Sequence, residues 1–120
     1  MAAFGFQKFC GRLWGWISLA SVYQDRDHLI KFFKALANEE RLEIVYLLKT
    51  KGELCAQDVE KHFYLEQSTT SHHLNTLKRA GVTRSRKDGR HIFYSVDFDR
   101  IEALIAEFKD LILTRSVSNQ

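Results

Sequence analysis

The sequence predicts a mainly α-helical domain with one small β-hairpin. The chain has 120 residues, of which 45% are apolar; this fits a single globular domain and excludes a multidomain enzyme. Proline is absent and the six glycines are widely spaced, which leaves long stretches where helices can run. Apolar residues recur with the helical period along the chain, and one Asp-Gly pair separates two β-prone stretches.

An aromatic extension is predicted over residues 1–24, ahead of a domain over residues 25–114 and a flexible tail over residues 115–120. The longest apolar run of the extension, Leu13 to Ala20, is shorter than the roughly 18–20 residues that span a bilayer, so no membrane partner is expected. Basic residues before this run and small residues at its end are typical of a signal peptide. The aromatic content favours instead an amphipathic extension that packs on the domain or on a second subunit.

Two helices are predicted at the start of the domain. The first carries an apolar stripe at i, i+3, i+4 and i+7, formed by Leu29, Phe32, Phe33 and Leu36. Its N-cap is predicted at Asp25 or Asp27. The second helix spans about Glu39 to Thr50, because Asn38 is a good N-cap and Gly52 is a stop signal.

A helix-turn-helix is predicted next. Its first helix spans Cys55 to His62, and its second runs from Gln67 to Ala80, where Gly81 ends it. The first two turns of the second helix are Ser, Thr, Gln and His. Ser and Thr weaken an isolated helix, so hydrogen bonds to something outside the protein explain them better.

A β-hairpin is predicted after this helix, with strands from Val82 to Arg86 and from His91 to Val96 joined by the turn at Asp88 and Gly89. The period of two predicts that Ile92, Tyr94 and Val96 face the core and that His91, Phe93 and Ser95 face away.

A last helix carries a long apolar stripe, with Asp97 or Asp99 near its start. The helix-turn-helix core is too small to cover both this stripe and the aromatic N-terminal helix, so a homodimer through the N- and C-terminal helices is predicted. The predicted dimerisation residues are Leu29, Phe32, Phe33, Ile101, Leu104, Ile105, Phe108, Leu111 and Ile112.

Positive charge is concentrated in one segment of the chain. The whole chain has a net charge of +3, whereas residues 67–96 hold six Lys and Arg against Asp88 alone, a net charge of +5. His72, His73 and His91 lie in the same segment. Basic runs are often just solvated surface, but clustering on two adjacent elements predicts a face for a polyanion.

A helix-turn-helix followed by a basic hairpin is a winged helix, and four stretches resemble the ArsR/SmtB family of bacterial and archaeal transcriptional repressors. These stretches are Phe33 to Ile44, Glu53 to Cys55, Gln67 to Leu74 and Gly89 to Tyr94. The resemblance covers about residues 25–114. It implies a winged helix-turn-helix of five or six helices plus a two-stranded wing. It also implies a homodimeric repressor that binds an operator and releases it when an inducer binds.

In this interpretation the second helix of the helix-turn-helix enters the major groove and the wing contacts phosphates or the minor groove. Two subunits would read half-sites about 34–36 Å apart, so the operator is expected to be an imperfect palindrome. The predicted DNA-binding residues are Gln67, Ser68, Thr69, Ser71, His72, Lys78, Arg84, Arg86, Lys87 and Arg90. His73 is expected to be a structural or coupling residue rather than to read bases.

Two residues depart from the family pattern. Glu66 stands where the family commonly has the serine that caps the recognition helix, so the start of this helix is less well defined by the sequence. Thr70 replaces an apolar residue, which is expected to change packing more than function.

Cysteines offer one candidate site for an inducer. Relatives that sense thiophilic metals carry Cys-x-Cys-Asp where this chain has Cys55, Gln57 and Asp58, so Cys55 alone is a weak ligand that Cys10 would have to complete. The one cofactor that these cysteines suggest is a thiophilic metal or metalloid ion. The alternatives are a redox or persulfide switch between Cys10 and Cys55, and a cysteine that simply fills the core.

A second family site, a histidine-rich zinc or nickel site on the last helix, is absent. The matching positions are Phe98, Arg100, Leu111 and Thr114.

The remaining function classes are disfavoured. The chain lacks a Gly-rich loop and a nucleophile with a recognisable base, so it is not expected to be an enzyme. Two cysteines cannot form a disulfide framework, and a reducing cytoplasm is expected. The main alternative is a winged helix that binds another protein and has lost DNA binding, and the basic wing argues against it.

Overall fold

The computed structural model describes residues 26–113. The predicted N-terminal extension, Asp25, Cys10 and the predicted C-terminal tail lie outside the described residues. The chain divides into two compact units, residues 1–30 and residues 31–120. Residues 26–30, the described part of the first unit, are helical.

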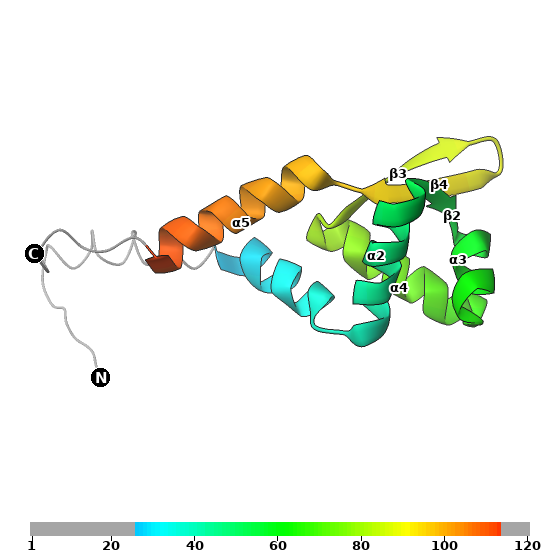
Figure 1. Ribbon diagram of the computed structural model, residues 1–120, viewed down its shortest axis with the longest axis horizontal. Helices are drawn as coiled ribbons and strands as arrows, with labels where there is room; N and C mark the ends of the chain where they lie inside the picture. Colours follow the sequence, from blue (N-terminus) through cyan, green and yellow to red (C-terminus); the bar gives the residue numbers. More distant parts are fainter. Residues whose placement is uncertain (1–25, 114–120) are drawn as a thin grey trace, which may run out of the picture. The chain divides into compact units, whose positions relative to one another are not determined.

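Helices dominate the described residues, as predicted, and a small sheet completes the fold (Figure 1). Residues 26–36 are helical. The elements that follow are α2 (Glu39–Lys51), β2 (Glu53–Cys55), α3 (Ala56–Phe63), α4 (Gln67–Ala80), β3 (Thr83–Asp88), β4 (His91–Val96) and α5 (Phe98–Leu113). The winged helix-turn-helix is therefore confirmed, with five helical segments among residues 26–113.

The capping residues of α2, α4 and α5 lie where the sequence predicted them, whereas Asp27, a predicted N-cap of the first helix, lies within the helical residues 26–36. Asn38 Oδ1 accepts a hydrogen bond from the Arg41 amide at 2.9 Å and so caps α2. Asp97 Oδ1 accepts from the Arg100 amide at 3.1 Å, which selects Asp97 over Asp99 as the cap of α5. Gly81 ends α4 at a φ of 87°, a left-handed conformation that favours glycine. A Cβ there would also lie 3.1 Å from the Arg100 side chain, which would have to shift slightly.

The sheet has three strands rather than the predicted two. Its order is β2-β4-β3, and both neighbouring pairs are antiparallel. Cys55 pairs with Phe93 as the last residue of β2 and is the N-cap of α3, so it does not begin that helix as predicted. The sequence did not reveal β2 because three residues are too few to show a period of two.

The core lies between α2, α3, α4 and one face of the sheet. Tyr94 and Val96 on β4 are 8% and 4% exposed, as the period of two predicted. Ile92 was predicted to face the core as well, and this is wrong, because it is 45% exposed. It pairs with Lys87 close to the hairpin turn, away from the buried end of β4 that holds Tyr94 and Val96. The largest fully buried apolar side chains are Phe32, Ile44, Leu48, Val59, Leu74, Leu77 and Val82.

Thr70 has a buried hydroxyl that forms no hydrogen bond with the described residues. It lies in α4 with 0% exposure, and its Oγ1 has no hydrogen-bond partner among the described residues. Burying an unpaired hydroxyl costs free energy, so Thr70→Val is expected to raise the free energy of unfolding by about 1 kcal/mol in urea denaturation. Thr50→Val is the control, because the Thr50 hydroxyl is exposed and donates to the Tyr46 carbonyl at 2.9 Å. A less stable Thr70→Val variant would contradict this prediction.

Candidate nucleic-acid interface

Helix α4 exposes a polar stripe and buries the opposite side. Ser68, His72 and Asn75 are exposed at a helical spacing, whereas Leu74 and Leu77 are buried. Thr69 and Ser71 are half-buried at the edges of this stripe, and Gln67 and Lys78 are exposed. The helix begins at Gln67 although the Glu66 carboxylate makes no capping hydrogen bond. Short polar side chains on one face suit contacts to base edges in a major groove.

Two residues on the same face were missed in the sequence analysis. Asn75 and Arg79 are exposed at positions that continue the stripe of Ser68 and His72. The side-chain amide of an asparagine can accept from the adenine N6 amino group and donate to adenine N7, and an arginine can bond a phosphate or guanine. Continuing the helical count beyond His72 would have found both residues.

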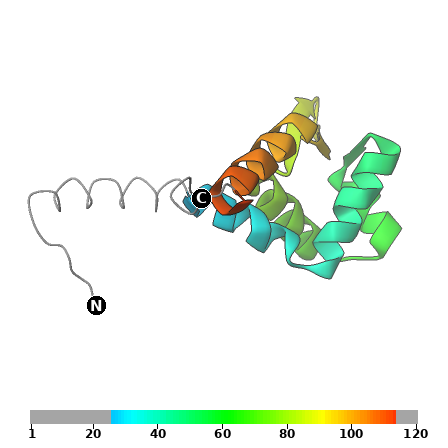
Figure 2. The same ribbon diagram turned by 60° about the vertical axis from the view of Figure 1, so that its left-hand side comes forward.

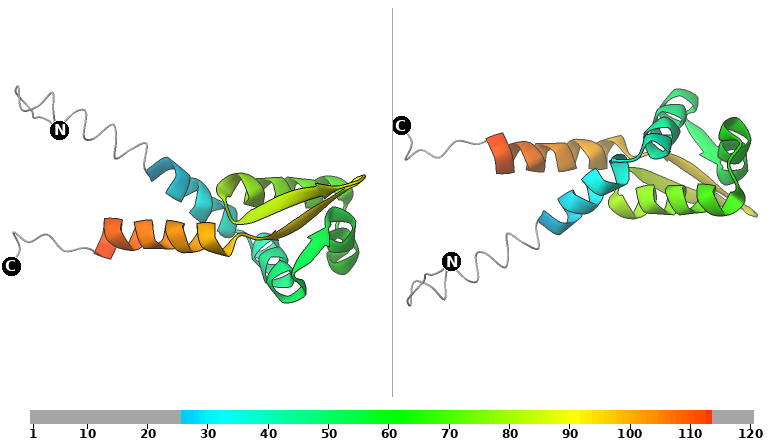
Figure 3. Two further views of the ribbon diagram at one scale, coloured as in Figure 1. Left: turned by 90° about the horizontal axis from the view of Figure 1, so that it is seen from above. Right: turned by 90° about the horizontal axis from the view of Figure 1, so that it is seen from below.

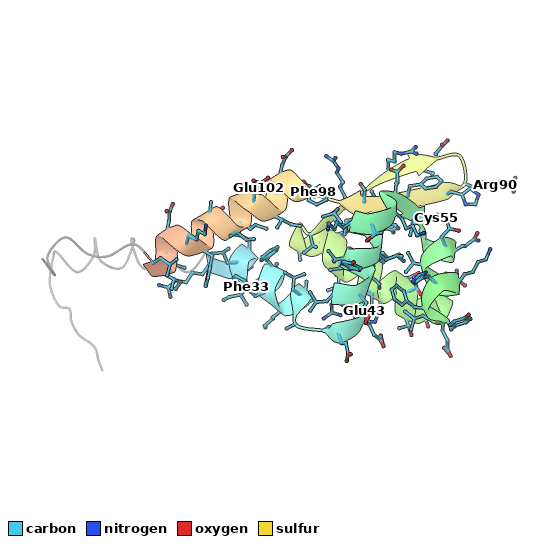
Figure 4. The ribbon with its side chains drawn as sticks, viewed as in Figure 1. Phe33, Glu43, Cys55, Arg90, Phe98 and Glu102 are labelled. Carbon is cyan, nitrogen blue, oxygen red and sulfur yellow. The ribbon has the colours of Figure 1, made fainter. Side chains whose placement is uncertain are left out.

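The tip of the wing and the N-terminal end of α4 line a common hollow. Both views of Figure 3 place the hairpin turn and the start of α4 at the same end of this unit. A hollow of about 230 Å³ lies between them, lined by Arg90 and His91 from the wing and by Gln67 and Ser71 from α4. Cys55 lines the same hollow, and Figure 4 shows Cys55 and Arg90 at this end. The helix and the basic arm therefore share one face.

Arg86 connects the wing to the rest of the sheet. Its Nε and Nη2 each donate to Glu53 at 2.8 Å, and its guanidinium lies 4.9 Å from the centre of the Phe93 ring. Nη1 lies 3.5 Å from Asp88. These contacts tie β3 across β4 to β2. Arg86 remains half-exposed, but its charge is already balanced by carboxylates.

The other wing cations are exposed on different faces of the hairpin. Lys87 pairs with Ile92, and so lies on the face that carries Tyr94 and looks toward the helices. Arg84 pairs with Ser95 on the opposite face. Among the described residues, Arg84, Lys87 and Arg90 make no ion pair, which leaves their charges available to a polyanion.

The contact of Glu53 with Arg86 gives a pH-dependent prediction. The hydrogen bond from Arg86, together with the charges of Arg86 and Arg84, lowers the pKa of Glu53 below its ordinary value of 4.5. The ion pair therefore stabilises the wing fully above that value, and this stabilisation is lost as pH falls through the lowered pKa. An NMR titration of the Glu53 carboxyl is expected to give a midpoint below 4.5, and Arg86→Gln is expected to raise it. An equal midpoint in both proteins would contradict the pairing.

His73 links α4 to α2 inside the protein. It is 6% exposed, in agreement with the expectation that it is structural. Arg41 Nη1 lies 3.3 Å from His73 Nδ1, and because a guanidinium can only donate, Nδ1 accepts. Nε2 therefore carries the proton and donates it to Glu40 at 2.7 Å. Arg41 also donates to the carbonyls of Ala35 at 2.6 Å and Lys34 at 3.3 Å, which fixes the end of the preceding helix.

Cys55 does not form a metal site with the described residues. It is buried, and its thiol donates to Asp58 Oδ2 at 3.2 Å. No group of three His, Cys, Asp or Glu side chains within residues 26–113 could hold a metal ion. A thiophilic metal prefers several thiolate ligands, so this thiol with one carboxylate does not suffice, and Cys10 lies outside the described residues.

The predicted dimerisation residues fall into two groups. Leu29, Phe32 and Leu104 are buried, and Ile101 is half-buried. The others are exposed by 36% to 58% of their surface: Phe33, Ile105, Phe108, Leu111 and Ile112. Phe33 and Phe108 contact each other with ring centres 4.9 Å apart, and Figure 2 shows α5 beside the helical residues 31–36. Exposed apolar side chains thus run along α5. Across residues 26–113, none of the helices combines the length and apolar character that crossing a membrane requires.

Comparison with known proteins identifies relatives of this chain. Residues 38–85 match the family model described as bacterial regulatory protein, arsR family. The chain is 40% identical over 75 residues to a cadmium resistance transcriptional regulatory protein CadC homolog of Staphylococcus aureus, and the match covers 62% of each, a little under two thirds of that relative. It is 41% identical over 85 residues to the cadmium resistance transcriptional regulatory protein CadC of Listeria innocua, covering 68% of this chain and 71% of that one.

Solved structures agree with this relationship. HlyU from Vibrio cholerae has a TM-score of 0.58 and 30% identity, over 75% of this chain and 97% of that one. An ArsR-like transcriptional regulator from a Rhodococcus species has a TM-score of 0.66 and 24% identity over 73% and 82%, and supports the fold. The CadC relatives are transcriptional regulatory proteins, in agreement with the prediction that this chain is not an enzyme. The chain belongs to the ArsR family of bacterial regulatory proteins.

Proposed function

We propose that the chain is a transcriptional repressor that binds operator DNA as a homodimer. The observation that carries this proposal is the shared hollow between the wing and α4, because it puts two DNA-reading elements on one face. The stripe on α4 enters the major groove, and Arg84, Lys87 and Arg90 contact the neighbouring backbone or minor groove. The relatives include arsenical resistance operon repressors of Bacillus subtilis and Staphylococcus aureus.

The partner of the apolar surface on α5 is a second copy of the chain. Ile105, Leu111 and Ile112 are 41%, 43% and 58% exposed, and such a row of apolar side chains is normally covered. A twofold pair presents the α4 face twice, so the operator is expected to be an imperfect palindrome.

A salt titration tests the DNA-binding proposal. The affinity of the protein for a duplex from its own upstream region is measured by fluorescence anisotropy at several salt concentrations. The logarithm of the affinity is expected to fall steeply with the logarithm of the salt concentration, and Arg84→Ala and Arg90→Ala are each expected to reduce that slope by about one per lost phosphate contact. Lack of binding to any duplex would favour the alternative, a winged helix that binds another protein.

Release of DNA by a ligand at Cys55 stays a prediction. The relatives named for cadmium and arsenical resistance support a thiophilic inducer, and Cys55 lines the hollow between the wing and α4. A ligand on this sulfur would lie between the two DNA-reading elements. Native mass spectrometry with cadmium, arsenite, zinc or polysulfide, on the full chain and on Cys55→Ser, tests both the metal and the persulfide alternatives. Equal uptake by the two proteins would exclude Cys55.

A further inference from the structure

A second hollow lies along α4, and its lining is strongly basic. Its volume is about 450 Å³, and its lining includes Lys31, Lys34, Arg41 and Arg79, together with Thr76. The remaining lining residues are two alanines. Among the residues that the structure describes, no carboxylate lines this hollow. Four cations and a hydroxyl around one space suit an oxyanion.

This hollow and the wing lie on opposite sides of the exposed stripe of α4. With 3.6 residues per turn, Thr76 and Ala80 fall on one side of the row formed by Ser68, His72 and Asn75. Gln67 and Ser71 fall on the other side, and they line the hollow that the wing shares. A helix in a major groove has a DNA backbone on each side. The wing is placed to meet one backbone, and the basic hollow to meet the other.

Arg41 can hold an anion without giving up its structural contacts. Among the described residues, its guanidinium donates to the carbonyls of Ala35 and Lys34 and to His73. A guanidinium has five N–H groups, so two stay available after these three bonds. These bonds fix the group at the side of α4, so a bound anion would meet a donor already held in place.

We propose that the hollow lined by Lys34, Arg41, Thr76 and Arg79 binds a backbone phosphate of the DNA, on the side of α4 away from the wing. This inference rests on the proposed function. The ligand chemistry is a phosphate oxyanion, and its source is the duplex rather than a free phosphate compound. The contact adds affinity and orients α4, and it carries no sequence information.

The test uses the full chain and the double variant Lys34→Gln/Arg79→Gln, which removes two exposed cations and leaves Arg41 in place. The control is Lys49→Gln/Lys51→Gln, which removes two exposed cations from α2. Affinity for a random-sequence duplex and for the upstream duplex is measured at several salt concentrations. In the double variant, the slope of log affinity against log salt concentration is expected to become shallower by about one per lost phosphate contact, equally on both duplexes. The control is expected to keep the slope of the unaltered chain.

An unchanged slope in the double variant would overturn the inference while leaving the proposed function intact. A second arm titrates inorganic phosphate and follows thermal unfolding. A phosphate-dependent rise in Tm that the double variant lacks, with an unchanged DNA slope, would assign the hollow to a free phosphate compound and so overturn the assignment to DNA. Failure of the unaltered chain to bind any duplex would overturn the proposed function and this inference together.

Discussion

Ile105→Glu and Leu111→Glu are each expected to convert the dimer into monomers and to lower the affinity for the operator by about 100-fold or more. The two side chains are 41% and 43% exposed along α5, so a carboxylate there is tolerated in a free subunit. In a dimer the same carboxylate would be buried without a partner, which is costly. Once the subunits separate, each half-site is bound alone and the gain from simultaneous binding is lost.

Sedimentation equilibrium measures the assembly of these variants, and fluorescence anisotropy measures their DNA affinity. The matched control is Leu42→Glu, an equally drastic change at a residue of α2 that is 52% exposed. It is expected to leave both the assembly and the affinity unchanged. Circular dichroism checks that each variant folds. Variants that stay dimeric would exclude α5 as the interface, and monomers that keep full affinity would exclude the proposed two-site binding.

His72 and His73 are neighbours in α4 with opposite expected roles. His73→Ala is expected to lower the free energy of unfolding by about 2–3 kcal/mol, because it opens a cavity and leaves Arg41 without an acceptor for one N–H. His72→Ala removes an exposed side chain and is expected to change stability by less than about 0.5 kcal/mol. Its effect is expected on the affinity for the operator instead, where losing one base contact costs about 1–3 kcal/mol, or roughly 5- to 150-fold in affinity.

Urea denaturation and anisotropy on the two variants separate these roles. The affinity of His73→Ala is compared under conditions where circular dichroism shows it folded. Glu40→Gln provides a milder test, because a glutamine oxygen still accepts the His73 Nε2 proton, so most of the stability is expected to remain. If His72→Ala lost as much stability as His73→Ala, the hydrogen bonds of His73 with Arg41 and Glu40 would not explain the structural role of His73.

The sequence predicted the parts of the fold that depend on neighbours along the chain. Asn38, Gly52 and Gly81 marked the ends of helices because capping is local, and the Asp-Gly pair marked the hairpin turn. Strand β2 was missed because three residues carry no readable period, and Ile92 was misplaced because the period gives a face but not where the core ends.

The candidate interface, like the fold, could be predicted from the sequence only in part. Residue type and spacing alone indicated a polar helix, a basic wing and the family, and these signals belong to single elements. Tertiary structure decided which side chains are free to act: it joined Arg86 to Glu53, placed His73 between Arg41 and Glu40, and gathered a second group of cations beside α4. Such pairings bring together residues about 30 or more positions apart, and periodicity along one element cannot reveal them.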